Sequence, residues 1–257
     1  MSRKIALVRR PSALVAQGEV THIDRVPMDV ALAFEQHAGY LRLLERHGYE
    51  LVYVADAPEH PDGIFVEDTV VMVDGVAIIT RPGAESRRGE IVSTAVAVAA
   101  LGLKSEAIAA PGTLDGGDVL VVGEHVFIGR TTRTNDDGIA TFRALAAPLG
   151  YTTIGVDVPG CLHLKSAITA LPDGSLIGVP TWVDRTVFTS EGFLVHDALE
   201  PSGGDVLCLG DTVVIAASAP RTVALVRDLG FDVETINVGE LEKIECGVTC
   251  MSVLVLT

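Results

Sequence analysis

The sequence has little positive charge. Its 257 residues include 19 lysines and arginines against 34 aspartates and glutamates, which gives a net charge of −15 at pH 7. Nucleic-acid binding draws on clustered Lys and Arg, and neither such a cluster nor a stacking-aromatic motif is present. We therefore expect no nucleic-acid partner. An acidic surface is compatible with a cationic small ligand, although solubility alone is the commoner reason for one.

Long hydrophobic runs are also missing. The longest weakly polar run, Ile91 to Leu103, is shorter than the roughly 20 residues that span a bilayer. The first ten residues have a basic end but only four apolar residues in a row, Ile5 to Val8, which are too few for a signal peptide. We therefore expect a cytoplasmic protein with no membrane partner.

Cysteine is scarce and irregularly spaced, at positions 161, 208, 246 and 250. In a cytoplasmic chain of this size these thiols are expected to be reduced. Cys161 and His163 could form a zinc set with Cys246 and Cys250, but the paired CxxC spacing of structural zinc sites is absent. We therefore expect no metal.

Signature motifs of several enzyme classes are missing as well. No GxGxxG follows a strand and no GxxxxGK[ST] occurs, which argues against a dinucleotide-binding or P-loop fold. Neither GxSxG nor HExxH occurs, so a serine hydrolase or a zinc peptidase is not favoured. The chain does have 48% hydrophobic residues, enough for a large core, and we expect one domain over residues 1–257.

A unit of about 40 to 50 residues recurs along the chain. In each unit polar residues lead an apolar strand, and a tight turn and a second strand follow in all but the last. The leading positions are 68, 118, 166, 205 and 250, separated by 50, 48, 39 and 45 residues. A hairpin and a helix at this period are typical of a radial or solenoidal repeat. We therefore predict an α/β fold of five ββαβ units around a pseudo-fivefold axis.

The fifth unit begins at Thr249 and lacks its second strand. If the units close into a ring, Ile5 to Val8 at the other end of the chain would supply that strand and hide the open edges. The alternative is a doubly wound open sheet. It is less favoured because Asp-Gly turns of two residues are typical of hairpins rather than crossovers.

The last segment, Ile244–Leu256, is predicted as one buried strand, yet it begins with a carboxylate and two thiols. Three other strands also begin with ionisable groups. In a closed ring these strand starts would converge on one channel. The groups that would share it are Asp68, Asp115 or Asp118, His163 and Cys250.

Each of these residues alone has an ordinary structural explanation. An aspartate can cap a turn, a histidine can pack in a core and a cysteine can act as a small hydrophobe. Buried together without a function, they would cost on the order of several kcal/mol. A cysteine with a histidine and a carboxylate is the set used for nucleophilic attack, so we favour a catalytic site.

The site has more acids than a cysteine peptidase needs. Carboxylates near a thiol raise its pKa, which is counterproductive unless the substrate is itself a cation. A planar guanidinium would satisfy two carboxylates and supply that charge. The surplus acids are Asp62, Glu67, Asp68 and Glu245.

Two arginines, Arg87 and Arg133, follow the second strands of adjacent units. They could hold a carboxylate at the far end of the ligand, or they could simply be solvated residues at helix starts. In the first case the ligand has a guanidinium at one end and a carboxylate at the other, as an arginine-like amino acid does.

Six motifs carry a close resemblance to a known family over nearly the whole chain. They resemble those of the dimethylarginine dimethylaminohydrolases of the guanidino-modifying (pentein) superfamily. The resemblance implies a five-bladed α/β propeller that hydrolyses Nω-methylated L-arginine to L-citrulline and a methylamine without a cofactor. The motifs are FVED at 65–68, ITRPGAESRRGE at 79–90, LDGGDVL at 114–120, RTN at 133–135, LHLKSA at 162–167 and VTCMSV at 248–253.

The resemblance also implies roles for single residues. Cys250 would be the nucleophile, His163 would protonate the departing amine and then activate water, and Asp115 would orient His163. Cys246 would be only a neighbour. The residues that would hold the substrate are Asp62, Glu67 and Asp68, with Arg87 and Arg133 for its carboxylate and the Ile244 carbonyl for its amine.

Two expected substrate-contacting positions depart from the family pattern. Glu245 stands where many relatives carry Asp, and Glu19 stands after Gly18 where Leu is usual. Two alternatives therefore stay open: another guanidino enzyme, such as an arginine deiminase or amidinotransferase, and a non-catalytic propeller that binds an amino acid. The sequence is compatible with a homodimer but does not determine the oligomeric state.

Overall fold

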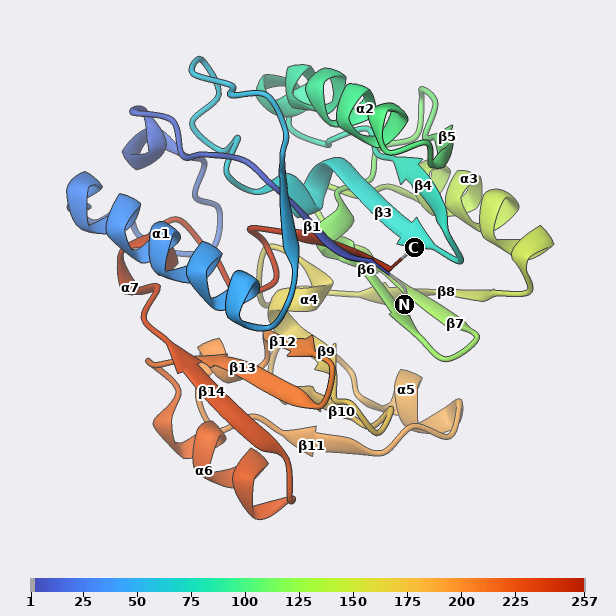
Figure 1. Cartoon of the computed structure of the whole chain (residues 1–257). Helices are drawn as coiled ribbons and strands as arrows, with labels where there is room; N and C mark the ends of the chain where they lie inside the picture. Colours follow the sequence, from blue (N-terminus) through green and yellow to red (C-terminus); the bar gives the residue numbers. More distant parts are fainter. Residues whose placement is uncertain (1–2, 257) are drawn as a thin grey trace.

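The computed structural model describes residues 3–256, and within them five three-stranded sheets surround a common centre (Figure 1). In every sheet the first two strands are antiparallel, and the third returns parallel to the second after a helix. One strand from each sheet lines a central cavity of about 230 Å³. The predicted five ββαβ units and α/β propeller are confirmed, and the alternative of an open doubly wound sheet is wrong.

The units share one element order. The first has β3 (Val70–Val73), β4 (Val76–Ile79), α2 (Ile91–Ala100) and β5 (Lys104–Ala107). The second has β6 (Val119–Val122), β7 (His125–Arg130), α3 (Asp136–Ala146) and β8 (Thr152–Asp157). The third has β9 (Ile168–Ala170), β10 (Leu176–Gly178), α5 (Thr186–Ser190) and β11 (Val195–Asp197). The fourth has β12 (Val206–Leu209), β13 (Thr212–Ala216), α6 (Pro220–Asp228) and β14 (Asp232–Ile236).

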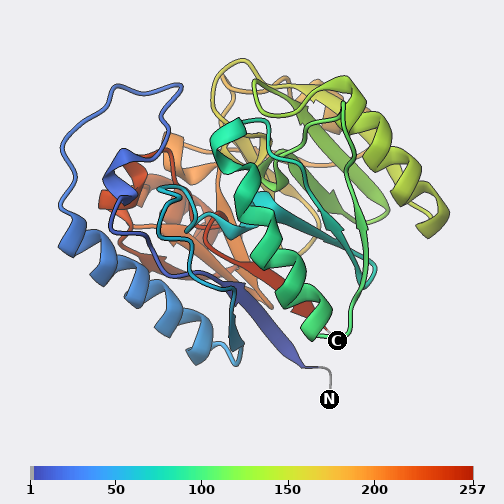
Figure 2. The same ribbon diagram turned by 90° about the horizontal axis from the view of Figure 1, so that it is seen from above.

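The fifth unit joins the two ends of the chain. It consists of β15 (Val253–Leu256), β1 (Lys4–Val8), α1 (Val30–Arg46) and β2 (Glu50–Tyr53). β1 pairs antiparallel with β15, with Ile5 opposite Val255, so the amino-terminal strand completes the last unit as predicted. β1 and β15, the first and the last strand of the chain, lie side by side in both views (Figures 1 and 2). This pairing closes the ring.

Short helices precede four of the five inner strands, where the sequence predicted only polar strand starts. They are η2 (Val66–Thr69), η4 (Gly116–Asp118), α4 (Leu164–Ala167) and η6 (Pro201–Gly203). The remaining short helices are η1 (Val15–Gln17), η3 (Glu85–Glu90), η5 (Ala147–Leu149) and α7 (Gly239–Glu242). The outer helices α1, α2, α3 and α6 lie on the outside of the ring (Figure 1).

The expectation of one strand over Ile244–Leu256 is wrong. Only Val253–Leu256 is a strand, and the preceding residues form an irregular loop. Glu245 has a φ of 61°, a left-handed conformation that a strand cannot contain. Side chains satisfy the loop backbone instead, since Asp205 accepts the Thr249 N–H at 3.0 Å.

Helix α1 has a capped amino-terminal end and one buried face. The Asp29 carboxylate accepts the Leu32 N–H at 3.1 Å and caps the helix. On this helix Phe34 is 38% exposed, whereas Tyr40 is fully buried. Within residues 3–256 no helix has the length and apolar character needed to cross a bilayer.

A tight turn at Asp74 and Gly75 joins β3 to β4. Both residues have positive φ, 46° and 75°, which matches the turn type that favours two-residue hairpins. Gly39 lies instead inside helix α1, where a methyl group would meet only the Arg42 side chain at 3.8 Å. The backbone conformation therefore requires glycine at residue 75 but not at residue 39.

We expect Gly75→Ala to lower the free energy of unfolding by about 1 kcal/mol, because alanine is strained at positive φ. Gly39→Ala should raise it by about 0.5 to 1 kcal/mol through helix propensity. Urea denaturation of the two variants beside wild type measures both. Changes of the same sign would contradict the hairpin geometry.

Candidate active site

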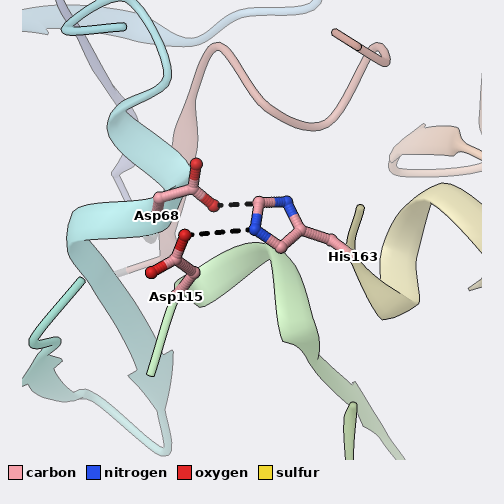
Figure 3. Close-up of side chains that lie close together, drawn as sticks. All are labelled: Asp68, Asp115 and His163. Carbon is pink, nitrogen blue, oxygen red and sulfur yellow. Dashed lines mark hydrogen bonds and ion pairs between the residues drawn. The ribbon is translucent and has the colours of Figure 1, made fainter. Parts of the chain in front are cut away.

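Three segments that precede inner strands place His163 in contact with two carboxylates. Asp68 lies in η2, Asp115 precedes η4, and His163 precedes α4. His163 Nε2 lies 3.1 Å from Asp115 Oδ2, and Nδ1 lies 3.8 Å from Asp68 Oδ1. Figure 3 shows both carboxylates pointing toward the same imidazole ring. All three side chains are buried, so the predicted convergence of these strand starts holds for them.

Gly117 makes this approach possible. A methyl group at residue 117 would lie 2.6 Å from His163 Nδ1 and 2.8 Å from Asp68 Oδ1, which is closer than atoms can pack. The Gly117 N–H also donates to Asp68 Oδ1 at 2.9 Å. The second glycine of the GGD motif is therefore required by the contact between His163 and Asp68, a reason that the sequence alone did not reveal.

The carboxylates keep His163 charged. Burial alone would lower the pKa of His163, but the negative charges of Asp68 and Asp118 and the hydrogen bond with Asp115 raise it to about 9. Burial would raise the pKa of Asp68, but His163, Arg87 and the Gly117 N–H lower it to about 2. The two groups therefore form an imidazolium–carboxylate pair at neutral pH.

The choice between Asp115 and Asp118 is settled by their partners. Asp115 contacts the His163 ring, whereas Asp118 accepts hydrogen bonds from Thr131 at 2.7 Å and Thr134 at 2.6 Å. Asp118 also accepts the Leu164 N–H at 3.0 Å. Burial raises the pKa of Asp118 to about 6. Asp118 thus ties the start of α4 to the neighbouring unit and does not contact the ring.

Cys250 is anchored beside the consecutive acids Glu67 and Asp68. Its carbonyl accepts the Glu67 N–H at 3.2 Å, and the neighbouring Thr249 hydroxyl donates to Glu67 Oε2 at 2.9 Å. Because Asp68 follows Glu67 directly, the two consecutive acids contact the Cys250 segment on one side and His163 on the other. The Gly247 N–H donates to the Cys250 sulfur at 3.3 Å.

The surroundings of the Cys250 sulfur favour the thiol over the thiolate. A hydrogen bond with the Cys246 thiol, burial, and the charges of Asp205 and Glu67 all raise the pKa of Cys250 well above its usual value. The raised pKa of Cys250 agrees with the expectation from the sequence that the surplus acids disfavour a thiolate. A cation brought beside the sulfur would reverse it.

Lys165 is a charged partner that the sequence analysis did not assign to the site. Its ammonium lies 2.6 Å from Glu67 Oε1. Burial raises the pKa of Glu67, and the Lys165 charge acts against that rise. The only sequence signal was its place two residues after His163, which does not identify its partner.

Arg87 is fully buried and already paired. Its guanidinium donates to Asp68 at 2.6 Å, to Glu90 at 2.9 and 3.1 Å, and to the carbonyls of Asp62 and Phe65. Burial would lower the pKa of Arg87, but Glu90 and Asp68 raise it well above its usual range. Its predicted contact with a substrate carboxylate stays a prediction.

Arg133 is buried beside the loop of residues 18–27. Its Nη2 lies 2.9 Å from Glu19 Oε2, and the Ser86 hydroxyl donates to the other Glu19 oxygen. Asp62, another predicted ligand residue, accepts the Glu19 N–H through both oxygens, at 3.1 and 3.2 Å. Glu19, Asp62 and Arg133 are therefore brought together, as the sequence analysis expected of residues in one site.

Glu245 holds the same loop through its backbone. Its two carboxylate oxygens accept the N–H groups of Thr21 and His22 at 2.6 and 2.7 Å. The preceding residue, Ile244, is buried, and within residues 3–256 its carbonyl accepts no hydrogen bond. That carbonyl is suited to accept an N–H from a ligand.

A cavity of about 440 Å³ adjoins this region. Its walls include Leu162, which precedes His163, and Cys246 and Gly247, which lie close to Cys250 in the chain. His22 and Ile23 of the 18–27 loop also line it. His163 and Cys250 are not among its lining residues.

The only group within residues 3–256 with the spacing of metal ligands is Asp68, Asp115 and His163, whose donor atoms lie within 4.8 Å of one another. These donors already have partners: Asp68 bonds Arg87 and Gly117, and Asp115 bonds His163. A guanidinium directly on Asp68 disfavours a further cation there.

The alternative zinc set of Cys161, His163, Cys246 and Cys250 is not gathered at one point in the part of the chain that the structure describes.

No protein-family model matches the chain. Two curated relatives are named N(G),N(G)-dimethylarginine dimethylaminohydrolase. The one from Streptomyces coelicolor is 48% identical over 98% of this chain and 97% of its own length. The one from Pseudomonas aeruginosa is 33% identical over 97% of this chain and 98% of its own.

Solved structures agree with the sequence relatives. An adduct of dimethylarginine dimethylaminohydrolase with S-methyl-L-thiocitrulline is 32% identical, with a TM-score of 0.92 over 99% of this chain and all of the other. The Pseudomonas aeruginosa enzyme complexed with citrulline is 31% identical, with a TM-score of 0.90 over the same shares. An amidinotransferase from Microseira wollei, 15% identical with a TM-score of 0.83 over 98% of this chain and 94% of its own, shares the fold alone.

Five ββαβ units in a closed ring, with a histidine, carboxylates and a cysteine segment at its centre, define a guanidino-modifying α/β propeller of the pentein type. Within that class the chain belongs to the dimethylarginine dimethylaminohydrolase family.

We expect the His163 ring to stay protonated up to a pH of about 9. Because this folded pKa exceeds the ordinary 6.5, the stability that His163 contributes is complete below pH 6.5 and is lost as the pH rises through 9. NMR titration of the ring resonances measures it, with His163→Gln to assign the signal. His37, whose pKa burial lowers to about 4, is the internal control. A His163 midpoint near 6.5 would contradict the paired geometry.

Proposed function

We propose that this protein hydrolyses Nω-methylated L-arginine to L-citrulline and a methylamine. The observation that carries the proposal is the 48% identity, over nearly the full length of both chains, to a curated dimethylarginine dimethylaminohydrolase. The site supports it independently, because buried carboxylates surround a histidine and a high-pKa thiol. Such a site is suited to a substrate that brings its own positive charge.

The first half of the reaction begins when the guanidinium group binds among the acids. Its charge lowers the pKa of the Cys250 thiol, which loses its proton to solvent, and the thiolate attacks the guanidinium carbon. The imidazolium of His163 gives its proton to the methylated nitrogen as the carbon–nitrogen bond breaks. A methylamine leaves, and a thiouronium group remains bonded to Cys250.

The second half uses the neutral imidazole that the first half leaves. His163 takes a proton from a water molecule, which attacks the thiouronium carbon. The carbon–sulfur bond then breaks, the hydroxyl proton of the adduct passes to the departing sulfur, and L-citrulline leaves with the Cys250 thiol restored. Asp115 keeps the ring oriented through its hydrogen bond to Nε2 and supports the charged form of His163 at each turnover.

The other site residues hold the substrate in this proposal. Glu67, Asp68 and Asp62 face its cationic groups, and the Ile244 carbonyl accepts an N–H from its amine. Arg133 and Arg87 hold its carboxylate. Glu245 acts through the loop, because its carboxylate bonds the Thr21 and His22 N–H groups. No step requires a metal or a cofactor.

We further propose that residues 1–257 form one catalytic domain that works in the cytoplasm on a small-molecule substrate. The four cysteines form no disulfide within residues 3–256, which is compatible with a reducing compartment. A homodimer, and the expected lack of nucleic-acid and membrane partners, stay predictions.

We expect purified protein to release citrulline from dimethylarginine and monomethylarginine faster than from arginine, and to keep this activity after treatment with a chelator. A colorimetric citrulline assay on the three substrates measures this. Arginine as the best substrate would indicate a deiminase instead. No citrulline from any of them, with binding retained, would indicate a non-catalytic propeller.

Cys250→Ser and His163→Ala should each abolish turnover, because one removes the nucleophile and the other removes the proton donor. Cys246→Ser should keep most of it, since a serine hydroxyl preserves the hydrogen bond that Cys246 donates to the Gly247 carbonyl at 3.1 Å. The citrulline assay with thermal melts as folding control measures all three. Equal loss in all three variants would contradict the assigned nucleophile.

A further inference from the structure

The guanidinium that is proposed to bind the substrate carboxylate already holds a carboxylate of this chain. Within residues 3–256, Glu19 is the one acid that forms an ion pair with Arg133, at 2.9 Å. The second Glu19 oxygen accepts a hydrogen bond from Ser86. Both oxygens of Glu19 therefore have partners, in the geometry of a bound carboxylate.

The two partners differ in burial. The Arg133 side chain is 6% exposed, whereas the Glu19 side chain is 40% exposed. A buried cation without a partner is costly, so Arg133 needs an anion in the absence of substrate. A side chain already reaching solvent loses little when it turns into water, so Glu19 is the partner able to leave.

The backbone around Glu19 is held independently of its side chain. Asp62 accepts the Glu19 N–H, and Glu245 accepts the N–H groups of Thr21 and His22. A methyl group on Gly18 would lie 2.8 Å from Asp62 Oδ1, so this close approach depends on glycine. The Glu19 carboxylate can therefore rotate away while the loop stays on its anchors.

We propose that Glu19 is a specificity-determining residue that competes with the substrate carboxylate for Arg133. In the free enzyme Glu19 occupies the guanidinium, and a ligand carboxylate must displace it. When the product leaves, Glu19 returns to Arg133. This inference rests on the proposed function, because it takes Arg133 as the carboxylate-binding residue.

The test compares Glu19→Gln with wild type on two ligands. One is Nω-monomethyl-L-arginine, and the other is the same methylguanidine on an aminobutyl chain without the carboxylate. Glu19→Gln should lower KM for the first by about three-fold, the size expected for removing a half-exposed ion pair. It should leave KM for the second unchanged, because that ligand displaces nothing. Glutamine keeps an oxygen for Ser86, so the loop contact is preserved.

Two further variants make the test specific. Glu85→Gln removes an exposed acid that pairs with Arg88 at 3.0 Å in the neighbouring η3, and it should change neither KM. Arg133→Ala should raise KM for the carboxylate-bearing ligand more than it lowers kcat, and it should abolish the effect of Glu19→Gln in the double variant.

A KM that rises in Glu19→Gln, or that falls equally for both ligands, would overturn the proposal. If wild type has no turnover, calorimetric Kd values for L-citrulline replace KM. Citrulline binding that tightens in Glu19→Gln would then support competition even though the proposed reaction had failed. If citrulline does not bind to wild type or variant, no carboxylate reaches Arg133 and the inference is wrong.

Discussion

The pairing of a buried imidazolium with buried carboxylates is the constraint on which the site depends. His163 can keep its proton inside the protein because Asp68 and Asp115 lie at its two nitrogens, and Asp68 is held in turn by Arg87 and Gly117. Removing one member would leave another buried without its counter-charge. In the proposed reaction, the same arrangement that stabilises the charges supplies the proton that His163 gives to the leaving amine.

That pairing requires a closed ring. Asp68, Asp115, His163 and Cys250 come from four different units, and each stands just before the inner strand of its unit. The turn before an inner strand points toward the common centre, so groups far apart in the chain meet there. Pairing of β1 with β15 fixes the strand that follows Cys250, and thus links the position of the thiol to the amino terminus.

The sequence predicted the repeat well and the local geometry less well. Polar residues before apolar strands recur at a regular period, so the five units and the convergence of His163, Asp68 and Asp115 could be inferred. The loop before Val253 was taken for a strand because its apolar residues hide the left-handed Glu245. Partners such as Lys165 for Glu67 depend on distances between units, which no local pattern encodes.

The charged groups proposed to bind substrate share one further property, which is that each already has an internal partner. Asp68 has Arg87, Glu67 has Lys165, and Arg133 has Glu19. Burying an unpaired charge is costly, so a site for a zwitterionic, cationic amino acid cannot stay stable with its charges bare. Substrate binding then exchanges one ion-pair partner for another. Its net free energy is the difference between the pairs made with the substrate and the internal pairs that they replace. The most exposed partner is the easiest to exchange, and Glu19 is more exposed than Lys165 or Arg87. In the proposed competition, Glu19 is therefore the internal partner that a ligand carboxylate displaces at the lowest cost.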